Sequence, residues 1–347
     1  MDQTFAIRFR DSNSDSRKSK IQNLKFGLMV GAMLLALGHP AEAQQPGKIW
    51  KIGVLVSSSP SLNASRDEAL RQGLRGLGYV EGQNIIMEFR YAEGKMDRLP
   101  QLAAELVRLK PDVIVAGGTQ VAAAAKKATS TIPIVVAGAG DLVGANLIRS
   151  FMFPGSNVTG VSRISPDFFG TRLKLIKEVI PNANRLAALS NPDNPGHGPS
   201  LKDFELGAHV LKMTLQTLAV RSPNNMEGAI RDAAKGRADA LFVMTDAMFN
   251  SHLSRIAELA MKYRLPSMYD RTDFVEADGL MSYGVNLVEL SRRAAEYVDQ
   301  ILKGAKPSDL TLVEPMKFDL AINLKTANQI GVTIPPELLA RAAKVIK

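Results

Sequence analysis

The feature of this sequence that most constrains its fold is a repeated alternation between short apolar runs and amphipathic segments. Runs such as 51–56 (KIGVLV) and 113–116 (VIVA) consist almost entirely of residues that favour buried strands. Between such runs lie segments such as 99–109, whose apolar residues recur at the spacing of one helix face. Short buried strands separated by amphipathic helices indicate parallel sheets covered on both faces. The pattern predicts an α/β fold.

The alternation occurs twice along the chain. The first series of predicted strands ends at 158–162, and the second series starts with a predicted helix at 168–179. A long predicted helix at 287–302 and a further tail follow, and they most simply return to cover both series. We therefore expect two Rossmann-like lobes with parallel sheets, joined by hinge crossovers. The expected boundaries are 44–162 plus 284–315 for lobe 1 and 163–283 plus 316–347 for lobe 2.

Several less regular stretches also receive an assignment from the same patterns. Residues 142–151, 250–263 and 337–346 each have apolar positions at helical spacing, so each is predicted to form one helix. Residues 311–313 (TLV) are predicted to form a short strand.

Residues 1–43 have the pattern of a cleavable secretory signal peptide. A basic stretch at 17–25 precedes an apolar run at 26–37, and Ala41-Glu42-Ala43 provides a small-residue cleavage site. The alternative is a membrane anchor, but a run of about a dozen apolar residues is shorter than the ~20 that a bilayer span needs. The chain contains no cysteine, so it has neither a disulfide framework nor a cysteine to accept a lipid. We expect a protein released without lipidation into a periplasm.

The basic charge balance raises the question of a nucleic-acid partner. The formal net charge is +9 and the sequence pI is about 9.6, which is a feature of many nucleic-acid-binding proteins. Here the basic residues are interspersed with acidic ones, as in Lys174, Lys177 and Glu178, and no basic stripe with interleaved aromatic residues occurs. Export would also separate the protein from nucleic acid. We expect a solvated basic surface and no nucleic-acid partner.

Candidate ligand-binding residues follow the predicted strands, because ligands in open parallel sheets bind beyond the carboxyl ends of the strands. The small and hydroxyl-bearing residues of the first series, together with helix N-termini, suit a carboxylate. The acidic and aromatic residues of the second series suit an amine and apolar or cation–π contacts. Taken singly, each residue is equally typical of turns and helix caps. The candidates are Ser57, Ser58, Gly118, Thr119, Gly138, Gly140, Asp141, Asn191, Asp246, Tyr269 and Tyr283.

The sequence predicts no catalytic residues, no metal site and no cofactor. The glycines of 138–144 approach a dinucleotide fingerprint, but the third glycine comes one residue late and the run follows the fourth predicted strand rather than the first. His197, His209 and His252 are far apart and lack the spacing of metal ligands. Residues 160–164 lack the closing glycine of a nucleophile elbow.

Short runs distributed over residues 43–347 resemble one known family, the extracytoplasmic substrate-binding proteins of ABC transporters, in its tryptophan- or tyrosine-binding branch. They include GYVEGQN, PGSNVTG and DGLMSYG. The matching ranges, in order, are 43–48, 71–75, 78–84, 98–100, 131–134, 154–160, 278–284, 301–307 and 323–327.

The resemblance implies a type I periplasmic-binding fold with three hinge strands and no enzymatic activity. It implies that Gly118 and Thr119, with the loop 138–141, seat a carboxylate, and that Asp246 faces an ammonium group. The expected ligand is an aromatic or other small amino acid, or a related carboxylate. The expected partners are the membrane permease and the ATPase of an importer, with the protein itself a monomer. A ligand sensor that serves a separate receptor and an exported α/β enzyme remain as alternatives.

Overall fold

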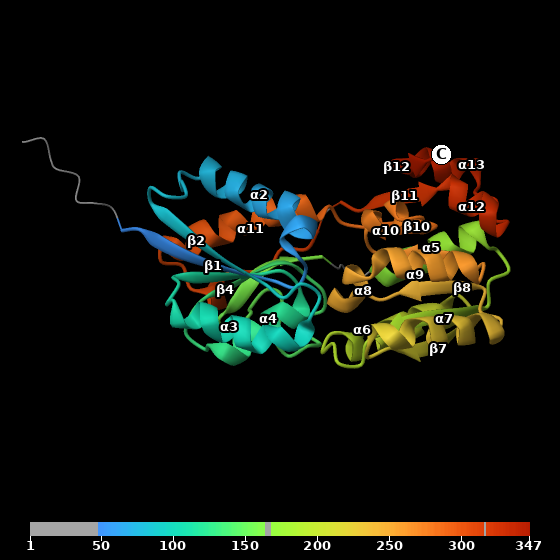
Figure 1. Cartoon of the computed structure of the whole chain (residues 1–347), viewed down its shortest axis with the longest axis horizontal. Coiled ribbons are helices and arrows are strands. Elements are labelled where there is room, and N and C mark those ends of the chain that lie inside the picture. The colour runs from blue at the N-terminus through green and yellow to red at the C-terminus, as the bar shows by residue number, and fades with distance from the viewer. Residues whose placement is uncertain (1–47, 164–167, 316) are drawn as a thin grey trace, which may run out of the picture. The chain divides into compact units, whose positions relative to one another are not determined.

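Two separate β-sheets organise the chain (Figure 1). The computed structural model describes residues 48–163, 168–315 and 317–347, and residues 49–347 belong to one compact unit. The predicted signal peptide at 1–43 lies outside the described residues. Within the described residues, no helix has the length and apolar character needed to cross a bilayer.

The first sheet is parallel and has the strand order β2-β1-β3-β4-β5. Its strands are short and mostly buried, as the apolar runs predict. The strands are β1 (Trp50–Val56), β2 (Ile85–Tyr91), β3 (Val113–Ala116), β4 (Ile134–Ala139) and β5 (Val158–Ser162).

Helices cover both faces of the first sheet. Helices α2 (Pro60–Gly76) and α11 (Leu287–Leu302) pack against each other on one face, although more than two hundred residues separate them in the chain (Figure 1). Helices α3 (Leu99–Arg108) and α4 (Thr119–Ala128) cover the other face. The short 3-10 helices η1 (Met96–Arg98) and η3 (Pro307–Asp309) lie in connections near this sheet.

The second sheet has the order β12-β11-β10-β9-β8-β6-β7. Neighbouring strands pair in parallel except for β10 and β11, which are antiparallel, so β11 and β12 run opposite to the other five strands. The strands are β6 (Arg185–Ser190), β7 (Thr214–Ala219), β8 (Ala240–Val243), β9 (Ser267–Tyr269), β10 (Met281–Gly284), β11 (Asp319–Asn323) and β12 (Lys344–Ile346).

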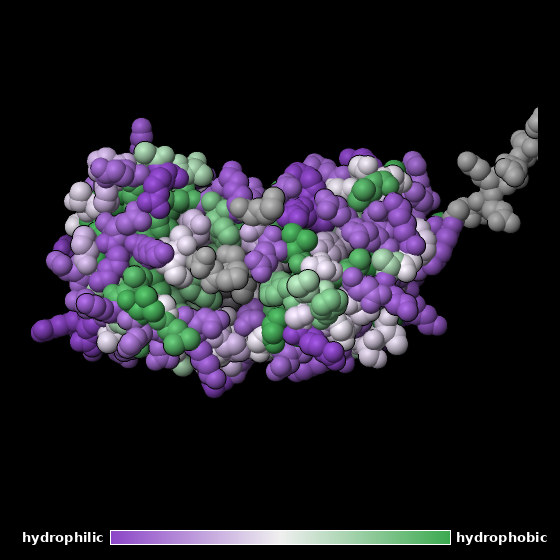
Figure 2. All heavy atoms as spheres, turned by 180° about the vertical axis from the view of Figure 1, so that it is seen from behind, coloured by the Kyte–Doolittle hydropathy of each residue, from purple (hydrophilic) through white to green (hydrophobic). Residues whose placement is uncertain are grey.

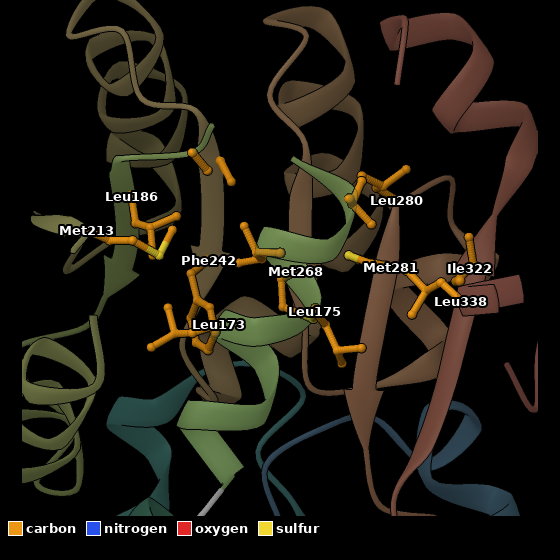
Figure 3. Close-up of a cluster of buried hydrophobic side chains, with 14 of the residues drawn as sticks. Leu173, Leu175, Leu186, Met213, Phe242, Met268, Leu280, Met281, Ile322 and Leu338 are labelled. Atoms are coloured by element: carbon orange, nitrogen blue, oxygen red, sulfur yellow. The ribbon is translucent and has the colours of Figure 1, made fainter. Parts of the chain in front are cut away.

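This sheet is also covered on both faces. One face carries α5 (Phe168–Val179), α6 (His197–Val210), α12 (Leu324–Ile330) and α13 (Pro336–Arg341). The other carries α7 (Met226–Lys235), α8 (Ala247–Ser251), α9 (Leu253–Lys262) and α10 (Thr272–Glu276), with η2 (Pro223–Asn225) leading into α7. Figure 3 shows the core of the first of these faces, where Leu173 from α5 and Phe242 from β8 lie beside each other.

The chain passes between the two sheets three times, after β5, after β10 and after η3. Near the last passage, Val313 forms an isolated bridge with Val161 of β5. The sequence anticipated such crossovers and the return of the long helix α11 to the first sheet. The residue boundaries proposed for two lobes remain a prediction.

Residues 142–151 do not form the predicted helix but a series of turns. Asn146 has a left-handed backbone with φ of 55°, which interrupts helical hydrogen bonding. Lys126 Nζ donates to the carbonyl oxygens of Asn146 at 3.2 Å and of Leu147 at 2.6 Å. A side chain from α4 therefore satisfies carbonyl groups that a helix would use internally.

The predicted helix at 250–263 is divided in two. His252, with φ of −125°, separates α8 from α9, and Asp246 caps a helix start that the pattern did not predict.

The prediction of one helix at 337–346 is also wrong, because α13 ends at Arg341 and the last residues form β12. This strand pairs in parallel with β11. The pairing with β11 therefore gives the last residues of the chain an extended conformation. The predicted strand at 311–313 is limited to the bridge of Val313.

The surface is mostly hydrophilic on the face that Figure 2 shows, with apolar side chains in separate small patches. Scattered apolar side chains of this kind are normal for a soluble fold. The most exposed large apolar residues are Met152, Phe153, Leu206 and Val210.

Candidate functional site

A pocket lies where the carboxyl ends of strands from both sheets meet. Its empty volume, including the part open to solvent, is about 1050 Å³. The first sheet contributes the segments that follow β1 and β3, the end of β4, and one face of α2. The second sheet contributes residues that follow β6, β8 and β9. This is the position at which open parallel sheets bind ligands.

Seven of the eleven residues predicted from the sequence line this pocket, and four do not. The lining residues are Ser57, Ser58, Gly118, Thr119, Gly138, Gly140 and Asp246. The residues that the structure places elsewhere are Asp141, Asn191, Tyr269 and Tyr283.

The part of the first-sheet wall that follows β3 and ends β4 contains three of the predicted glycines and one threonine. Gly118, with φ of 108°, stands at the N-cap of α4 and offers no side-chain acceptor to the first turn. Thr119 Oγ1 accepts a hydrogen bond of 3.0 Å from the backbone N–H of Gly140. Gly138, with φ of 81°, lies inside β4 at an irregularity in the pairing with β5. Backbone N–H groups at a helix N-terminus and close to glycines are suited to an anion.

Asp246 is the buried carboxylate of the opposite wall, with only 1% of its surface exposed. Its Oδ1 caps α8 by accepting from the N–H of Met248 at 2.8 Å. Its Oδ2 accepts from Asn194 Nδ2 at 2.9 Å and from Asn191 Nδ2 at 3.2 Å. All these donors are neutral, so they orient the carboxylate without an ion pair, and the nearest cation that its charge acts on is Arg163.

Asp141 and Asn191 support the site from behind the pocket surface. Asp141 Oδ1 accepts from the N–H of Gly144 at 2.7 Å, and burial raises the pKa of this carboxyl above its usual range. Asn191 is buried and bonds to Asp246. Both side chains therefore stabilise turns at strand ends, which is the alternative that the sequence left open for each.

Both predicted tyrosines pack against apolar clusters of the second sheet, Tyr269 fully buried and Tyr283 partly buried. Tyr269 is fully buried and stacks on Phe274 with ring centroids 4.4 Å apart. Tyr283 stacks on Phe318 at 5.2 Å. Alternate residues of a strand point to opposite faces, so a position near the end of a strand did not by itself establish that a ring faces the pocket.

His197 connects the loop after β6 to the end of β8. Its Nδ1 accepts from the N–H of Asn191 at 2.9 Å, so Nε2 carries the proton and donates to the carbonyl oxygen of Thr245 at 2.8 Å. Burial lowers the pKa of this imidazole. The neutral ring thus holds together the two segments that position Asp246.

Three arginines of the pocket wall were missed from the sequence: Arg66, Arg163 and Arg271. Arg163 follows β5 and forms a buried ion pair with Asp270 at 2.7 Å. Arg271 directly follows the buried Tyr269-Asp270 strand end. The rule that identified the other candidates, a polar residue after a strand, applies equally to these two arginines. Arg66 lies within α2, where it has the pattern of an ordinary surface residue.

The same face of α2 carries two more polar residues of the pocket. Asn63 Nδ2 donates to Asp67 Oδ1 at 2.6 Å, and the hydroxyl of Tyr91 donates to Asp67 Oδ2 at 2.7 Å. Burial raises the pKa of Asp67. Among the described residues, no group of three or more acidic or histidine side chains is arranged to hold a metal ion.

Comparison with known proteins gives the site its context. Residues 51–346 match the family described as ABC transporter substrate binding protein. The tyrosine-binding protein of Clostridioides difficile (strain R20291) is 26% identical over 275 residues, which are 79% of this chain and 78% of that protein.

Two solved structures are similar over most of the chain. A conserved domain protein from Vibrio cholerae O1 biovar eltor is 31% identical with a TM-score of 0.80, and the match covers 86% of this chain and 100% of that one. An ABC domain from Streptococcus pneumonia, in complex with L-Trp, is 30% identical with a TM-score of 0.80, covering 86% and 99%. The predicted α/β fold, that of the type I periplasmic binding proteins, is confirmed.

Proposed function

Because the chain belongs to the ABC transporter substrate binding protein family, we propose that it binds an aromatic or other small amino acid, or a related carboxylate, between its two sheets and delivers it to an importer. Substrate-binding proteins of ABC transporters are extracytoplasmic, bind small molecules and work with the other transporter components. For this chain, the proposal includes a cleavable signal peptide at 1–43, a periplasmic location and a permease with its ATPase as partners. It includes no catalysis.

The observation that carries the proposal is the opposition of two kinds of wall across one pocket. The first-sheet wall presents the N-terminus of α4 at Gly118 and Thr119, and the second-sheet wall presents the carboxylate of Asp246. An amino acid has one group for each: a carboxylate for the helix N-terminus and an ammonium group for the aspartate. The L-Trp complex and the tyrosine-binding relative agree with this ligand class.

A ligand that contacts both walls would favour the conformation in which the walls are close together. Its binding energy shifts an equilibrium between open and closed forms. The three chain passages between the sheets are the segments around which such a motion would turn. In this proposal the two lobes have the boundaries 44–162 plus 284–315 and 163–283 plus 316–347.

A thermal-shift screen of amino acids, with native mass spectrometry of the purified protein, tests this function. The two single-group analogues of phenylalanine, phenethylamine and 3-phenylpropionate, are the matched controls. An amino acid at about a hundred times its Kd should stabilise the protein by ~2.7 kcal/mol, and each analogue should do so much less. A flat melting temperature across all amino acids, with no co-purified solute, would contradict the ligand class.

A further inference from the structure

The arginine side chains of the pocket are a basic feature distinct from the N-terminus of α4. Arg66, Arg163 and Arg271 all line the pocket. Arg163 and Arg271 are only 7% and 8% exposed, and the Nε of each is buried without a hydrogen-bond partner in the described part of the chain. A buried donor without an acceptor costs free energy that a suitable ligand atom would recover.

Two of these arginines share one carboxylate. Nη2 of Arg66 lies 3.8 Å from Oδ2 of Asp273, and Nη2 of Arg271 binds the same oxygen. Burial, followed by the like charge of Arg271, lowers the pKa of Arg66 to about 9. Two guanidinium groups thus share one partly exposed carboxylate, so one acid faces two positive charges.

The third arginine has its own partner but adds to the same wall. Arg163 pairs with Asp270, which also accepts from the hydroxyl of Thr245. The two acids that line the pocket, Asp67 and Asp246, are bonded to neutral donors rather than to the arginines. The arginines therefore have no hydrogen bond to either pocket acid, although Asp67 and Asp246 lie close enough to act on the charges of Arg66 and Arg163.

We infer that Arg66, Arg163 and Arg271 form a second anion subsite, and that the ligand carries an acidic group besides the carboxylate held at the N-terminus of α4. The chemical class is a small amino acid with a second carboxylate. Guanidinium groups bind carboxylates through paired, charge-assisted hydrogen bonds, and they retain their charge where a lysine would lose it on burial. The inference rests on the proposed function.

Matched ligand pairs measure the subsite by isothermal titration calorimetry. The first pair is L-phenylalanine and 4-carboxy-L-phenylalanine, and the second is L-glutamine and L-glutamate. Within whichever pair binds, the acidic member should bind about tenfold more tightly or better. If the neutral member binds as tightly as its acidic partner, the second subsite is refuted while the amino-acid function stands. If no member of either pair and no other amino acid binds, the proposed function fails and the inference fails with it.

A variant of α2 provides the second test. The preference is the ratio of the Kd of the neutral ligand to that of the acidic ligand. Arg66→Gln should reduce this ratio to near one, and Arg66→Lys should retain part of it. Arg75→Gln, on the exposed face of the same helix, is the matched control and should keep the full preference. Melting temperatures without ligand show whether each variant is folded. An undiminished preference in folded Arg66→Gln would overturn the assignment of this wall.

Discussion

Asn194 donates a hydrogen bond of 2.9 Å from Nδ2 to Oδ2 of Asp246, and both side chains are buried beside the pocket. The carboxylate is therefore fixed by a neutral amide rather than by a cation. It also caps α8, so one residue has a structural and a proposed binding role. Experiments on Asp246 must separate the two roles.

Asp246→Asn is expected to weaken binding of an amino acid by more than about tenfold, because it removes the charge proposed to face the ammonium group. Binding of the matching acid without an amine should change much less. Asp246→Asn also places two amide donors opposite each other and should lower the free energy of unfolding. The double variant Asp246→Asn with Asn194→Asp restores a donor and an acceptor to the pair, so it should recover most of that loss. Calorimetry with phenylalanine and 3-phenylpropionate measures the binding. Equal losses for both ligands would indicate that Asp246 only supports the fold.

Arg172→Met is expected to raise the free energy of unfolding by about 1–4 kcal/mol. Arg172 is fully buried with none of its guanidinium nitrogens hydrogen-bonded in the described part of the chain, and it lies 3.8 Å from the ring centroid of Phe242. Burial lowers its pKa to about 9, which means that the charge is costly in this place. Urea unfolding measures the difference.

For Arg163, which forms a buried ion pair, we expect substitution to lower the free energy of unfolding. Arg163→Met removes the direct partner of the buried Asp270 and should cost about 3–5 kcal/mol. The contrast between the two variants separates an unpaired from a paired buried charge. A large destabilisation by Arg172→Met would show that this cation is needed beside Asp270.

If the proposed closure brings the turns after β4 against α6, Gly144→Ala is expected to weaken ligand binding by about tenfold or more, because it disfavours that contact. A Cβ on Gly144, in the turns after β4, would lie 2.5 Å from Cβ of Pro199 at the start of α6 and would also crowd Asp141. Calorimetry and the radius of gyration with ligand measure the effect. Gly198→Ala, where a Cβ meets no atom within 4 Å, should behave as the wild type, and Asp141→Ala controls for the turn itself.

The free energy of unfolding should fall as the pH is lowered through 6.5, the ordinary pKa of histidine. Burial holds the pKa of His197 below that value, so the unfolded chain takes up a proton before the native chain does. The loss continues until the native imidazole is protonated. His197→Gln keeps a donor and an acceptor but does not titrate, so its stability should fall less between about pH 7.5 and 5. His209→Gln, at an exposed position of α6, is the matched control.

The regular part of the fold was predictable because burial and periodicity agree there. The apolar runs 51–56 and 113–116 are strands with buried residues, and α3 buries the face that its periodicity marks. The errors occur where a distant partner decides the local structure. Lys126 binds the carbonyl groups of the turns at 142–151, and β11 pairs with the last residues of the chain. Neither partner is visible in a local pattern.

The site was predictable to the extent that it follows from the ends of strands. Gly118 and Asp246 line the pocket as that rule implies. The rule cannot tell which strand residue faces the pocket, so it included Tyr269, which is buried in the core. It also says nothing of helices, and Arg66 of α2 reaches the pocket only because of how that helix lies on the first sheet.

The bond between the hydroxyl of Thr119 and the N–H of Gly140 joins the segments after β3 and β4. This hydrogen bond restricts the movement of two neighbouring strand ends relative to each other. We therefore expect ligands of different size to be accommodated mainly by segments of the second sheet.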